Sequence, residues 1–521
     1  MKKYLKYIFT VIIMTSILPS CEDYLNIKPP NNLSEAQYYK TQEHAIQATT
    51  ACYDPLKHPG AFNINFFFVF TSFSDRGIHE QAALNKLSFT ANTNWVIQIY
   101  TYLYKGIARC NVALEKIPDI QMDEDLKARL LGEVRYLRAL YNFYIVTIYG
   151  TAPVIDHVIN DLDVKFHNST REDFLNIIES DLKQAIDVLP LTYDDANVGR
   201  ATRGAAMALL GKTYLYYQMW PEAKDYPQQV KDLADNQGVY GLMMPQGDAP
   251  KDYIYAYQCN FSAIDLTTPS GNTYDSENNK ESIFEIQFAE GGWEVWEGGW
   301  QADGSLTDLY FGPDGYKNLV PTADFVNAFE KAPASHPAGL EYDPRRYATI
   351  YEEGDTIHYL PSIDPPMAPV PWHSNKNTNP SISQGYGWQK YFDPCYNTNN
   401  GPTNLKIMRY SDVLLMLAEA DYHVNGSTQL GLDCINEVRN RVGLTPVTQV
   451  TPQAIIHERD VEFGFEWMRF FDLVRWSLLD APWVTITDFI PDFIVGKNEI
   501  LPLPQYEINL SGGNLLQNPG Y

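Results

Sequence analysis

Three tryptophans occur within eight residues of the stretch EGGWEVWEGGWQADG, which covers residues 290–304. Two Gly-Gly pairs interrupt this stretch, and glycine leaves the backbone free to present a side chain instead of burying it. Aromatic rings can lie against the flat C–H faces of sugars, and exposed aromatic rings mark binding surfaces. We therefore predict that at least one of Trp293, Trp296 and Trp300 contacts a ligand. The alternative, that these rings belong to the core or contact a partner protein, stays open.

A sugar also carries hydroxyl groups around its ring, and polar side chains would have to form hydrogen bonds with them. Asp75 and Arg76 lie in a loop before Trp95, and Tyr274 lies in a later region rich in loops. We predict Asp75, Arg76 and Tyr274 as further ligand contacts. A solvated surface turn is the competing interpretation of the Asp-Arg pair, because charged residues are mostly exposed.

Sequence patterns for catalysis are incomplete in this chain. Six residues separate Gly204 from Gly211, which is too many for a phosphate-binding loop. His457 is followed by Val461 where a zinc protease needs its second histidine. The sequence contains no GxSxG elbow and no CxxC pair. We predict no catalytic residue, no metal and no cofactor, and a glycoside hydrolase remains a minority alternative.

The start of the chain has the pattern of an export signal. A lysine-rich beginning precedes an almost wholly apolar run at residues 7–18, which is too short to span a bilayer. The sequence LPSC at residues 18–21 resembles a bacterial lipobox. We predict that residues 1–20 are a lipoprotein signal peptide and that Cys21 carries a lipid anchor. Two acidic residues directly after Cys21 resemble a signal that sends lipoproteins to the cell surface.

Charge and cysteine content narrow the function further. The 521 residues include 39 lysines and arginines against 64 acidic residues, a formal charge of −25. A strongly acidic protein is a poor partner for nucleic acid, whose binding depends on cations that neutralise phosphates. If Cys21 is lipidated, five of the six cysteines remain, which is an odd number, and a disulfide framework is not expected.

Hydrophobic periodicity predicts helices throughout the first half of the chain. The expected helical segments begin at residue 41 and include residues 95–117, 130–150, 169–189 and 203–225. Ser169 and Glu172 have the spacing of a capping box at the start of one of them. Leu210, Gly211 and Tyr214 match part of the tetratricopeptide pattern of paired helices. We expect a scaffold of stacked helix pairs. The apolar run FFFVF at residues 66–70 is expected to be buried.

Residues 236–405 lose this periodicity and become rich in glycine, proline, asparagine and aromatic residues. Short strands are expected at residues 282–288 and 347–351. Helical patterns return at residues 410–424, 432–442 and 452–479. The predicted fold class is therefore mainly α, with a tetratricopeptide-like helical-repeat scaffold and a large loop-rich region that carries a few short β-strands. The predicted division is 21–235 helical, 236–405 loop-rich and ligand-binding, and 406–521 helical and packed on the same domain.

Charged residues repeat at steps of three and four near the C-terminus, which suits ion pairs within one helix, each worth about 0.2–0.5 kcal/mol. These residues are Glu458, Glu462, Glu466, Arg469, Asp472 and Arg475. Because the pattern is regular and helical, we interpret it as an ion-paired scaffold and not as an active site.

Several longer segments together resemble the SusD/RagB family of surface lipoproteins that bind nutrients, usually glycans. The strongest are RYSDVLLMLAEA (409–420), INEVRNRVGL (435–444), ERDVEFGFEWMRFFDLVRW (458–476) and the terminal QNPGY (517–521). Earlier segments that agree are EVRYLRALYNFYIVTIYGTAPVI (133–155), GRATRGAAMALLGKTYL (199–215) and ESIFEIQF (281–288). The resemblance spans essentially the whole chain. One departure is Trp467, where the family more often has glycine.

The resemblance implies a tetratricopeptide-like helical layer with a ligand site on its loop-rich face, and no catalysis. It also implies a partner, a SusC-like TonB-dependent transporter in the outer membrane, to which the lipid-anchored protein delivers a captured glycan at the cell exterior. Three alternatives remain: the same architecture with peptide or another nutrient as cargo, a non-catalytic helical scaffold for partner proteins, and the glycoside hydrolase.

Overall fold

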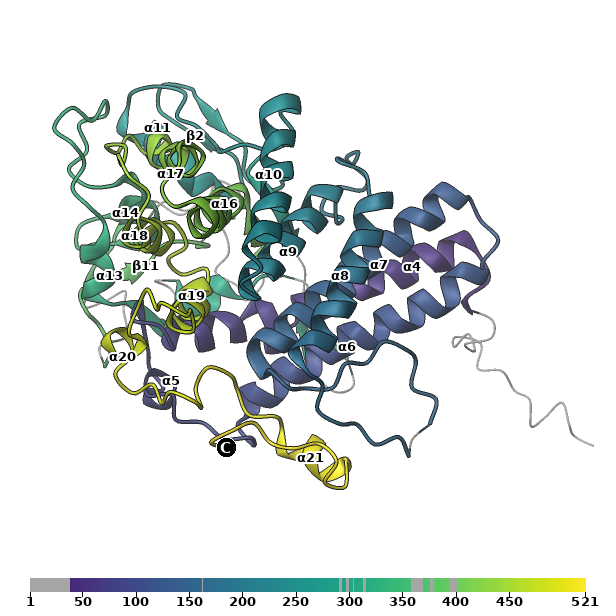
Figure 1. The fold of residues 1–521 in the computed structure, drawn as a ribbon. Helices are drawn as coiled ribbons and strands as arrows, with labels where there is room; N and C mark the ends of the chain where they lie inside the picture. The colour runs from purple at the N-terminus through teal and green to yellow at the C-terminus, as the bar shows by residue number, and fades with distance from the viewer. Residues whose placement is uncertain are drawn as a thin grey trace, which may run out of the picture.

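The computed structural model shows a mainly helical protein in which two groups of helices flank a central pair (Figure 1). Helices of the N-terminal half lie on one side, the C-terminal helices lie on the other, and α9 and α10 lie between them. The structure describes residues 38–161, 163–289, 293–296, 299–302, 304–312, 315–357, 369–374, 379, 381–392 and 401–521. The predicted signal peptide and Cys21 lie outside these residues.

The N-terminal layer consists of helices that pack on their neighbours in chain order from α6 to α10. These helices are α4 (Gln42–Tyr53), α6 (Asn94–Lys116), α7 (Glu124–Tyr149), α8 (Arg171–Val188), α9 (Arg203–Tyr216) and α10 (Trp220–Gln237), with a short turn η4 (Ile117–Asp119) after α6. The predicted helices of this half are confirmed, and the stretch 203–225 contains the whole of α9 and the start of α10. This arrangement is the predicted tetratricopeptide-like scaffold.

Small residues allow these helices to approach closely. A Cβ atom added at Gly106 of α6 would lie 2.2 Å from Cζ of Tyr141 on α7. A Cβ atom added at Gly211 of α9 would lie 2.5 Å from Cδ of Pro227 on α10. No side chain larger than hydrogen fits at either position without a shift of the neighbouring helix. The expected role of Gly211 in helix pairing is thus confirmed.

The start of α8 differs from the predicted capping box by one residue. Thr170, not Ser169, is the N-cap, and its hydroxyl accepts from the amide of Asp173 at 3.1 Å while the Asp173 carboxylate accepts from the amide of Thr170 at 2.7 Å. Ser169 instead accepts a hydrogen bond from the amide of Val154 at 2.9 Å. The two positions carry similar residue types, so the sequence alone could not distinguish them.

Irregular turns and a short strand connect α4 to α6. They are η1 (Asp54–Lys57), η2 (Pro59–Asn63), η3 (Phe67–Thr71), β1 (Gly77–His79) and α5 (Ala82–Asn85). The FFFVF run lies here and is buried as predicted, with the exception of a half-buried Phe68. Phe66 and Phe67 both pack edge-on against Trp467, so this segment is held to the C-terminal helices by aromatic contacts.

The region between residues 236 and 405 contains short helices and two-stranded antiparallel ribbons. The helices are α11 (Pro250–Gln258), η5 (Cys259–Phe261), α12 (Thr307–Phe311), α13 (Ala323–Ala328) and α14 (Pro344–Thr349). The strand pairs are β1 with β7 (Leu319–Pro321), β2 (Leu266–Thr267) with β3 (Thr273–Tyr274), β4 (Ser282–Ile286) with β12 (Leu405–Arg409), β5 (Trp293–Trp296) with β6 (Gly299–Ala302), β8 (Ile350–Tyr351) with β11 (Gly387–Trp388), and β9 (Thr356–Ile357) with β10 (Val370–Pro371).

The two strands expected in this region are both present but shorter than predicted. β4 covers most of the expected 282–288 segment. At 347–351 only the last two residues are extended, because α14 extends to Thr349. The region is therefore loop-rich with a few short strands, as the sequence indicated.

The C-terminal helices are α16 (Tyr410–Asn425), α17 (Gln429–Arg441), α18 (Pro452–Glu462), α19 (Met468–Ser477), α20 (Ile486–Phe489) and α21 (Gln505–Leu510). The prediction of one helix over 452–479 is wrong, because the chain breaks between α18 and α19. Phe465 and Trp467 adopt left-handed backbone conformations there, with φ of 61° and 50°. Both side chains are buried, so tertiary packing overrides the helical pattern of the sequence.

The predicted ion pairs within one helix are also mostly wrong. Glu458 binds Arg345 at 2.6 Å, Glu462 binds Arg409 at 2.8 Å, and Glu466 binds Lys390 at 2.9 Å, each on a different element. Of the residues in that predicted set, only Asp472 and Arg475 pair within a helix, at 2.9 Å. The interpretation as an ion-paired scaffold holds, but the ion pairs are buried and connect distant segments.

Candidate functional site

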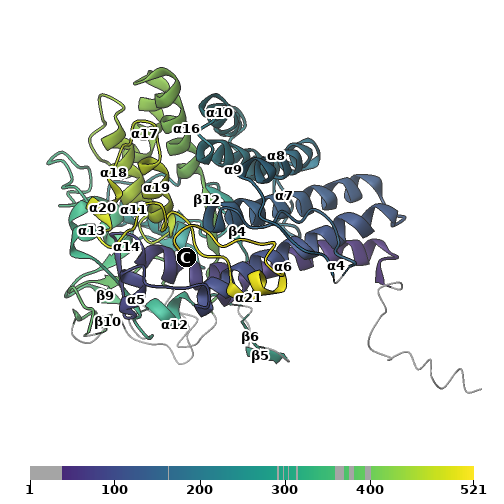
Figure 2. The ribbon, with the colours of Figure 1, turned by 60° about the horizontal axis from the view of Figure 1, so that its bottom comes forward.

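The tryptophan-rich stretch forms an antiparallel hairpin of β5 and β6 that projects from the body of the protein (Figure 2). Trp293 is opposite Ala302, Trp296 is opposite Gly299, and Trp300 is opposite Val295 in the strand register. Each of the three predicted tryptophans is therefore part of one short ribbon. The structure describes the backbone of this ribbon and not its side chains.

Hydrogen bonds hold the described chain on either side of the hairpin to the body. On the incoming side, the amide of Phe288 donates to Oδ1 of Asn404 at 2.8 Å. On the outgoing side, the fully buried Asn63 donates from Nδ2 to the carbonyl of Gly304 at 3.1 Å and to that of Lys57 at 3.1 Å. The amide of Leu306 donates back to Oδ1 of Asn63 at 2.9 Å. Phe288 and Gly304, on either side of the hairpin, are therefore both hydrogen-bonded to the body of the protein.

A surface groove of about 760 Å³ adjoins this flanking chain. It lies between α4, the loop that contains Gly199 and the end of β4, and its lining includes Gln47, Lys57, Val198 and Gln287. Lys57 lines the groove, and its carbonyl accepts the Asn63 hydrogen bond, so the groove adjoins the residue that holds Gly304. Amide side chains beside apolar surface suit a ligand that has both hydroxyl groups and apolar faces.

An aromatic pair that the sequence analysis missed follows the hairpin in the chain. Tyr316 is 61% exposed, and its ring lies 5.6 Å from that of Tyr310 on α12. Tyr310 in turn packs edge-on against Phe68 at 5.2 Å. Two backbone hydrogen bonds, Tyr316 to Leu309 at 2.7 Å and Asn318 to Tyr310 at 2.9 Å, fix the turn that presents Tyr316. The signal in the sequence was the same as for the tryptophans, aromatic residues beside glycine.

Asp75 and Arg76 form part of an ion-pair cluster under the surface. Nε of Arg76 donates to Asp460 at 2.8 Å, and Nε of Arg469 donates to Asp75 at 3.1 Å. Burial alone would lower the pKa of Arg76, but the charge of Asp460 outweighs burial and raises it. The cluster holds the loop before β1 on α18 and α19. No contact in the described part of the chain joins these two residues to the hairpin.

Tyr274 lies in the interior. Its ring is fully buried, its hydroxyl donates to Oδ1 of Asp252 at 2.8 Å, and the amide of Gln246 donates to that hydroxyl at 2.8 Å. These two hydrogen bonds satisfy the hydroxyl of Tyr274, and because the ring is buried, a ligand at the surface does not reach it. In this structure Tyr274 therefore packs the loop-rich region and is separate from the hairpin.

Neither a metal cluster nor a membrane span is found among the described residues. In that part of the chain no group of three or more histidine, cysteine, aspartate or glutamate side chains is placed to hold a metal ion. None of the described helices combines the length and the apolar composition that crossing a membrane requires. Cys52, Cys110, Cys259 and Cys434 are buried and not in disulfides, and they pack as small apolar residues.

The fold defines a mainly α, tetratricopeptide-like protein with a loop-rich middle region from which the β5–β6 hairpin projects. Two family models match it: the SusD family over residues 280–521, and a model described as "Starch-binding associating with outer membrane" over residues 23–215. The chain belongs to the SusD/RagB family. The family resemblance seen in the sequence is thus confirmed.

Named relatives agree with this assignment. A SusD-like protein of Bacteroides ovatus is 28% identical over 505 residues, which cover 91% of this chain and 83% of the relative. The starch-binding protein SusD of Bacteroides thetaiotaomicron is 25% identical over 497 residues, which cover 84% of this chain and 81% of the relative.

Solved structures share the same fold. A SusD-like protein from Bacteroides fragilis superposes with a TM-score of 0.74 at 24% identity, over 94% of this chain and 99% of that chain. A structure described as a laminarin-binding SusD-like protein superposes with a TM-score of 0.72 at 25% identity, over 93% of this chain and 100% of that chain. The predicted fold class is therefore confirmed.

Proposed function

We propose that this protein is a surface-exposed outer-membrane lipoprotein that binds an oligosaccharide or polysaccharide without cleaving it and delivers it to a SusC-like TonB-dependent transporter. The observation that carries the glycan part is the projecting β5–β6 hairpin, which contains Trp293, Trp296 and Trp300, together with a surface groove lined by residues near the chain that flanks it. Its relatives include proteins described as starch-binding and laminarin-binding.

The proposed binding mode follows from the chemistry of the two partners. Sugar rings have apolar C–H faces, which pair with aromatic rings, and hydroxyl rims, which exchange hydrogen bonds with amides and charged groups. The hairpin and the exposed Tyr316 supply aromatic surface, while the exposed Gln47 in the groove supplies an amide. Because the net charge is −25, we expect a neutral or weakly charged glycan in preference to a highly anionic one.

The proposed location rests on the N-terminus and on the family. Cys21, at the end of the lipobox-like sequence, would carry the lipid that holds the protein on the outer membrane. The description of one matching family model also refers to association with the outer membrane. Capture by the anchored protein would then precede transfer into the barrel of the transporter.

Gel electrophoresis in the presence of single polysaccharides tests the proposal. We expect one polysaccharide to retard the purified protein, and we expect simultaneous replacement of Trp293, Trp296 and Trp300 by alanine to remove the retardation with an unchanged circular dichroism spectrum. Loss of retardation in the folded triple variant supports the site, whereas unchanged retardation places the glycan elsewhere. If no polysaccharide retards the folded protein, peptide cargo becomes the better hypothesis, and release of sugar products over hours would identify a hydrolase.

A further inference from the structure

A second surface groove, also of about 760 Å³, lies between α7 and α8. None of the residues that line this α7–α8 groove lines the groove near the hairpin. Its volume falls within the roughly 300–1,000 Å³ that ligand pockets usually occupy. The aliphatic part of its lining consists of Leu114, Val154 and Ile177.

One wall of the α7–α8 groove carries polar side chains of α8. Asn176, Ser180 and Gln184 follow one another at steps of four residues, which places them on one face of the helix. Nε2 of Gln184 donates to Oγ of Ser180 at 3.2 Å, and the hydroxyl hydrogen of Ser180 can then donate to a ligand. Hydroxyl and amide groups beside aliphatic side chains suit a small sugar, which has both hydroxyl and C–H groups.

One of the two arginines that line the α7–α8 groove is neutralised by the protein itself. Arg138 donates from Nε to Oδ2 of Asp181 at 2.7 Å and from Nη2 to Oδ1 at 2.8 Å. Burial alone would lower the pKa of Arg138, but its hydrogen bonds to Asp181 outweigh burial and raise it. The Arg138–Asp181 pair therefore belongs to the scaffold that joins α7 to α8.

The two other carboxylates of the groove also have partners in the protein. Oδ1 of Asp156 lies 2.8 Å from Nδ1 of His157. The Asp173 carboxylate accepts from the amide of Thr170 at 2.7 Å and from its hydroxyl at 2.8 Å, at the start of α8 where a negative charge is favoured. Neither carboxylate depends on a ligand for its hydrogen bonds.

Arg135, the second arginine of the α7–α8 groove, is the exception. It is half-buried, and within the described part of the chain it has neither a hydrogen bond nor an ion pair. Burial lowers the pKa of Arg135 more than the attraction of Asp181 raises it, and the like charge of Arg138 lowers it further. A guanidinium has five N–H donors, so the groove contains a cation whose donors are open to a ligand.

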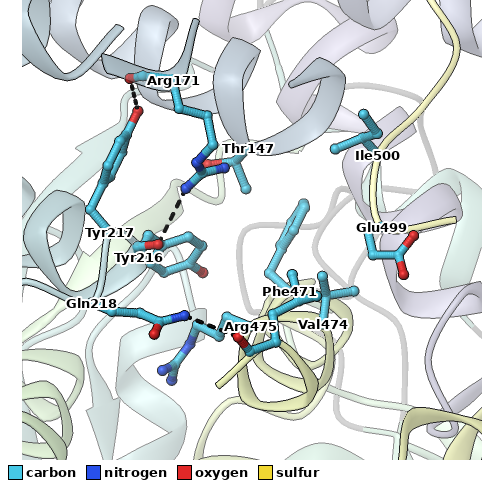
Figure 3. Close-up of a pocket in the computed structure, with 11 residues that line it drawn as sticks. Thr147, Arg171, Tyr216, Tyr217, Gln218, Phe471, Val474, Arg475, Glu499 and Ile500 are labelled. Carbon is cyan, nitrogen blue, oxygen red and sulfur yellow. Dashed lines mark hydrogen bonds between the residues drawn. The ribbon is translucent and has the colours of Figure 1, made fainter. Parts of the chain in front are cut away.

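A smaller cavity of about 300 Å³, where α8, α9 and α19 meet, differs in this respect (Figure 3). Its Arg171 donates from Nη2 to the carbonyl of Tyr216 at 3.3 Å, and Oε1 of its Glu499 accepts from the amide of Gly496 at 2.8 Å. Arg135 makes no contact of this kind in the described part of the chain, so the α7–α8 groove is the better candidate for an anion site.

We propose that the α7–α8 groove binds a small hydrophilic oxyanion, of the class of a sugar that carries one carboxylate or phosphate group. The oxyanion accepts hydrogen bonds from Arg135, whose planar fork matches both groups. The sugar hydroxyls bind Asn176 and Ser180, and the C–H groups lie on the aliphatic side chains of the groove. An uncharged sugar would leave Arg135 without a partner.

The overall charge of the protein is compatible with a ligand that has one acidic group. The net charge of −25 opposes a polyanion, but salt screens charges that lie more than roughly 8–10 Å away, so the nearby Arg135 governs one oxyanion. The proposal does not depend on glycan binding at the hairpin, because the α7–α8 groove shares no lining residue with the groove near it.

Isothermal titration calorimetry of the purified protein with glucose, glucuronate and glucose 6-phosphate tests the proposal. The three ligands share a sugar ring and differ in the group at carbon 6. We expect at least one of the two acids to bind about tenfold more tightly than glucose, because a charge-assisted hydrogen bond is roughly twice as strong as a neutral one. Tighter binding of glucuronate would identify a carboxylate site, and tighter binding of glucose 6-phosphate would identify a phosphate site.

Two substitutions assign the preference to the groove. Arg135→Gln should reduce the affinity for the acid to that for glucose without lowering the melting temperature, because no hydrogen bond or ion pair within the described chain is lost. An arginine with a merely structural role would lower the melting temperature instead. Asn176→Asp adds a carboxylate at an exposed position of the groove and should weaken the acid much more than glucose.

Lys183→Gln is the matched control. Lys183 lies on α8 beside Gln184, its side chain is 51% exposed, and it is not part of the groove lining. Its replacement removes the same charge and should leave the preference for the acid unchanged. Equal affinity of the folded protein for glucose and both acids would overturn the proposal, as would a preference that survives Arg135→Gln or that Lys183→Gln weakens equally.

Discussion

Arg409 and Glu466 form a two-pronged ion pair in the interior, with Nε of Arg409 2.9 Å from Oε2 of Glu466 and Nη2 2.8 Å from Oε1. Arg409 ends β12, and Glu466 lies in the break between α18 and α19. The pair therefore joins the loop-rich region to the C-terminal helices. Nη1 of Arg409 also donates to Glu462 at 2.8 Å and to Glu281 at 2.6 Å.

Replacement of Arg409 by methionine should strongly destabilise the fold. The change leaves the carboxylates of Glu281, Glu462 and Glu466 buried with one cation fewer, and breaking a buried ion pair in this way costs about 3–5 kcal/mol. Chemical denaturation measures the free energy of unfolding. Arg109→Met is the control, because Arg109 is exposed and its pair with Asp54 at 2.6 Å should contribute at most about 1 kcal/mol. Similar losses in both variants would show that the buried network does not stabilise the fold.

Acid should destabilise the protein partly through Glu330. Burial opposes ionisation of this carboxyl, but its contacts with His457 and Arg439 outweigh burial and lower its pKa from 4.5 to about 2. Between these values the unfolded chain holds a proton that the folded chain does not. The stabilisation from Glu330 is therefore complete above pH 4.5 and is lost as the pH falls toward 2.

Thermal unfolding from about pH 5 to pH 3 measures this effect. Glu330→Gln should lower the melting temperature at the upper end of the range and flatten its fall toward the lower end. Glu341→Gln is the control, because the Glu341 carboxylate is exposed and lies 4.0 Å from an exposed Lys331. A pH dependence in Glu330→Gln as steep as in the wild type would contradict the assignment.

Gly106→Ala should separate α6 from α7. The added methyl group would lie 2.2 Å from Cζ of Tyr141, whose hydroxyl is held by a hydrogen bond to the carbonyl of Cys52 at 2.8 Å. Because the ring cannot move freely, we expect a loss of about 1–3 kcal/mol in the free energy of unfolding, in spite of the better helix propensity of alanine. Gly241→Ala, where the nearest atom is Lys280 Cδ at 3.8 Å, should have little effect. If Gly106→Ala left the free energy of unfolding unchanged, the prediction would be wrong, because α6 and α7 would have shifted to make room for the methyl group.

Tyr316→Ala should weaken glycan binding without a change in stability. Tyr316 is 61% exposed and follows the hairpin, so its loss removes aromatic surface from the proposed site and little from the core. We expect about tenfold weaker binding in affinity gels, the usual scale for an aromatic contact that matters. Tyr506 on α21 is equally exposed, at 63%, and Tyr506→Ala should bind normally. Equal binding by both variants would remove Tyr316 from the site.

Local patterns in the sequence predicted most of the helices and the loop-rich character of the middle region. The start of α8 was predicted to within one residue because capping depends on a few adjacent side chains. Gly211 could be assigned to a helix contact because its pattern is repeated in stacked helix pairs. The family was visible in the same way, as an ordered set of short segments.

Only the tertiary structure decided which charged side chains form ion pairs with each other and which aromatic side chains are buried. The sequence placed Glu462 and Glu466 on one helix with Arg469, but the chain breaks at Phe465 and Trp467, and both carboxylates turn to Arg409. Long-range packing sets such contacts, and sequence spacing cannot report them. The same reason explains why Tyr274 is buried and Tyr316 exposed, although both lie in loop-rich sequence. It also explains why Arg171 and Glu499, 328 residues apart by their numbers, line one cavity.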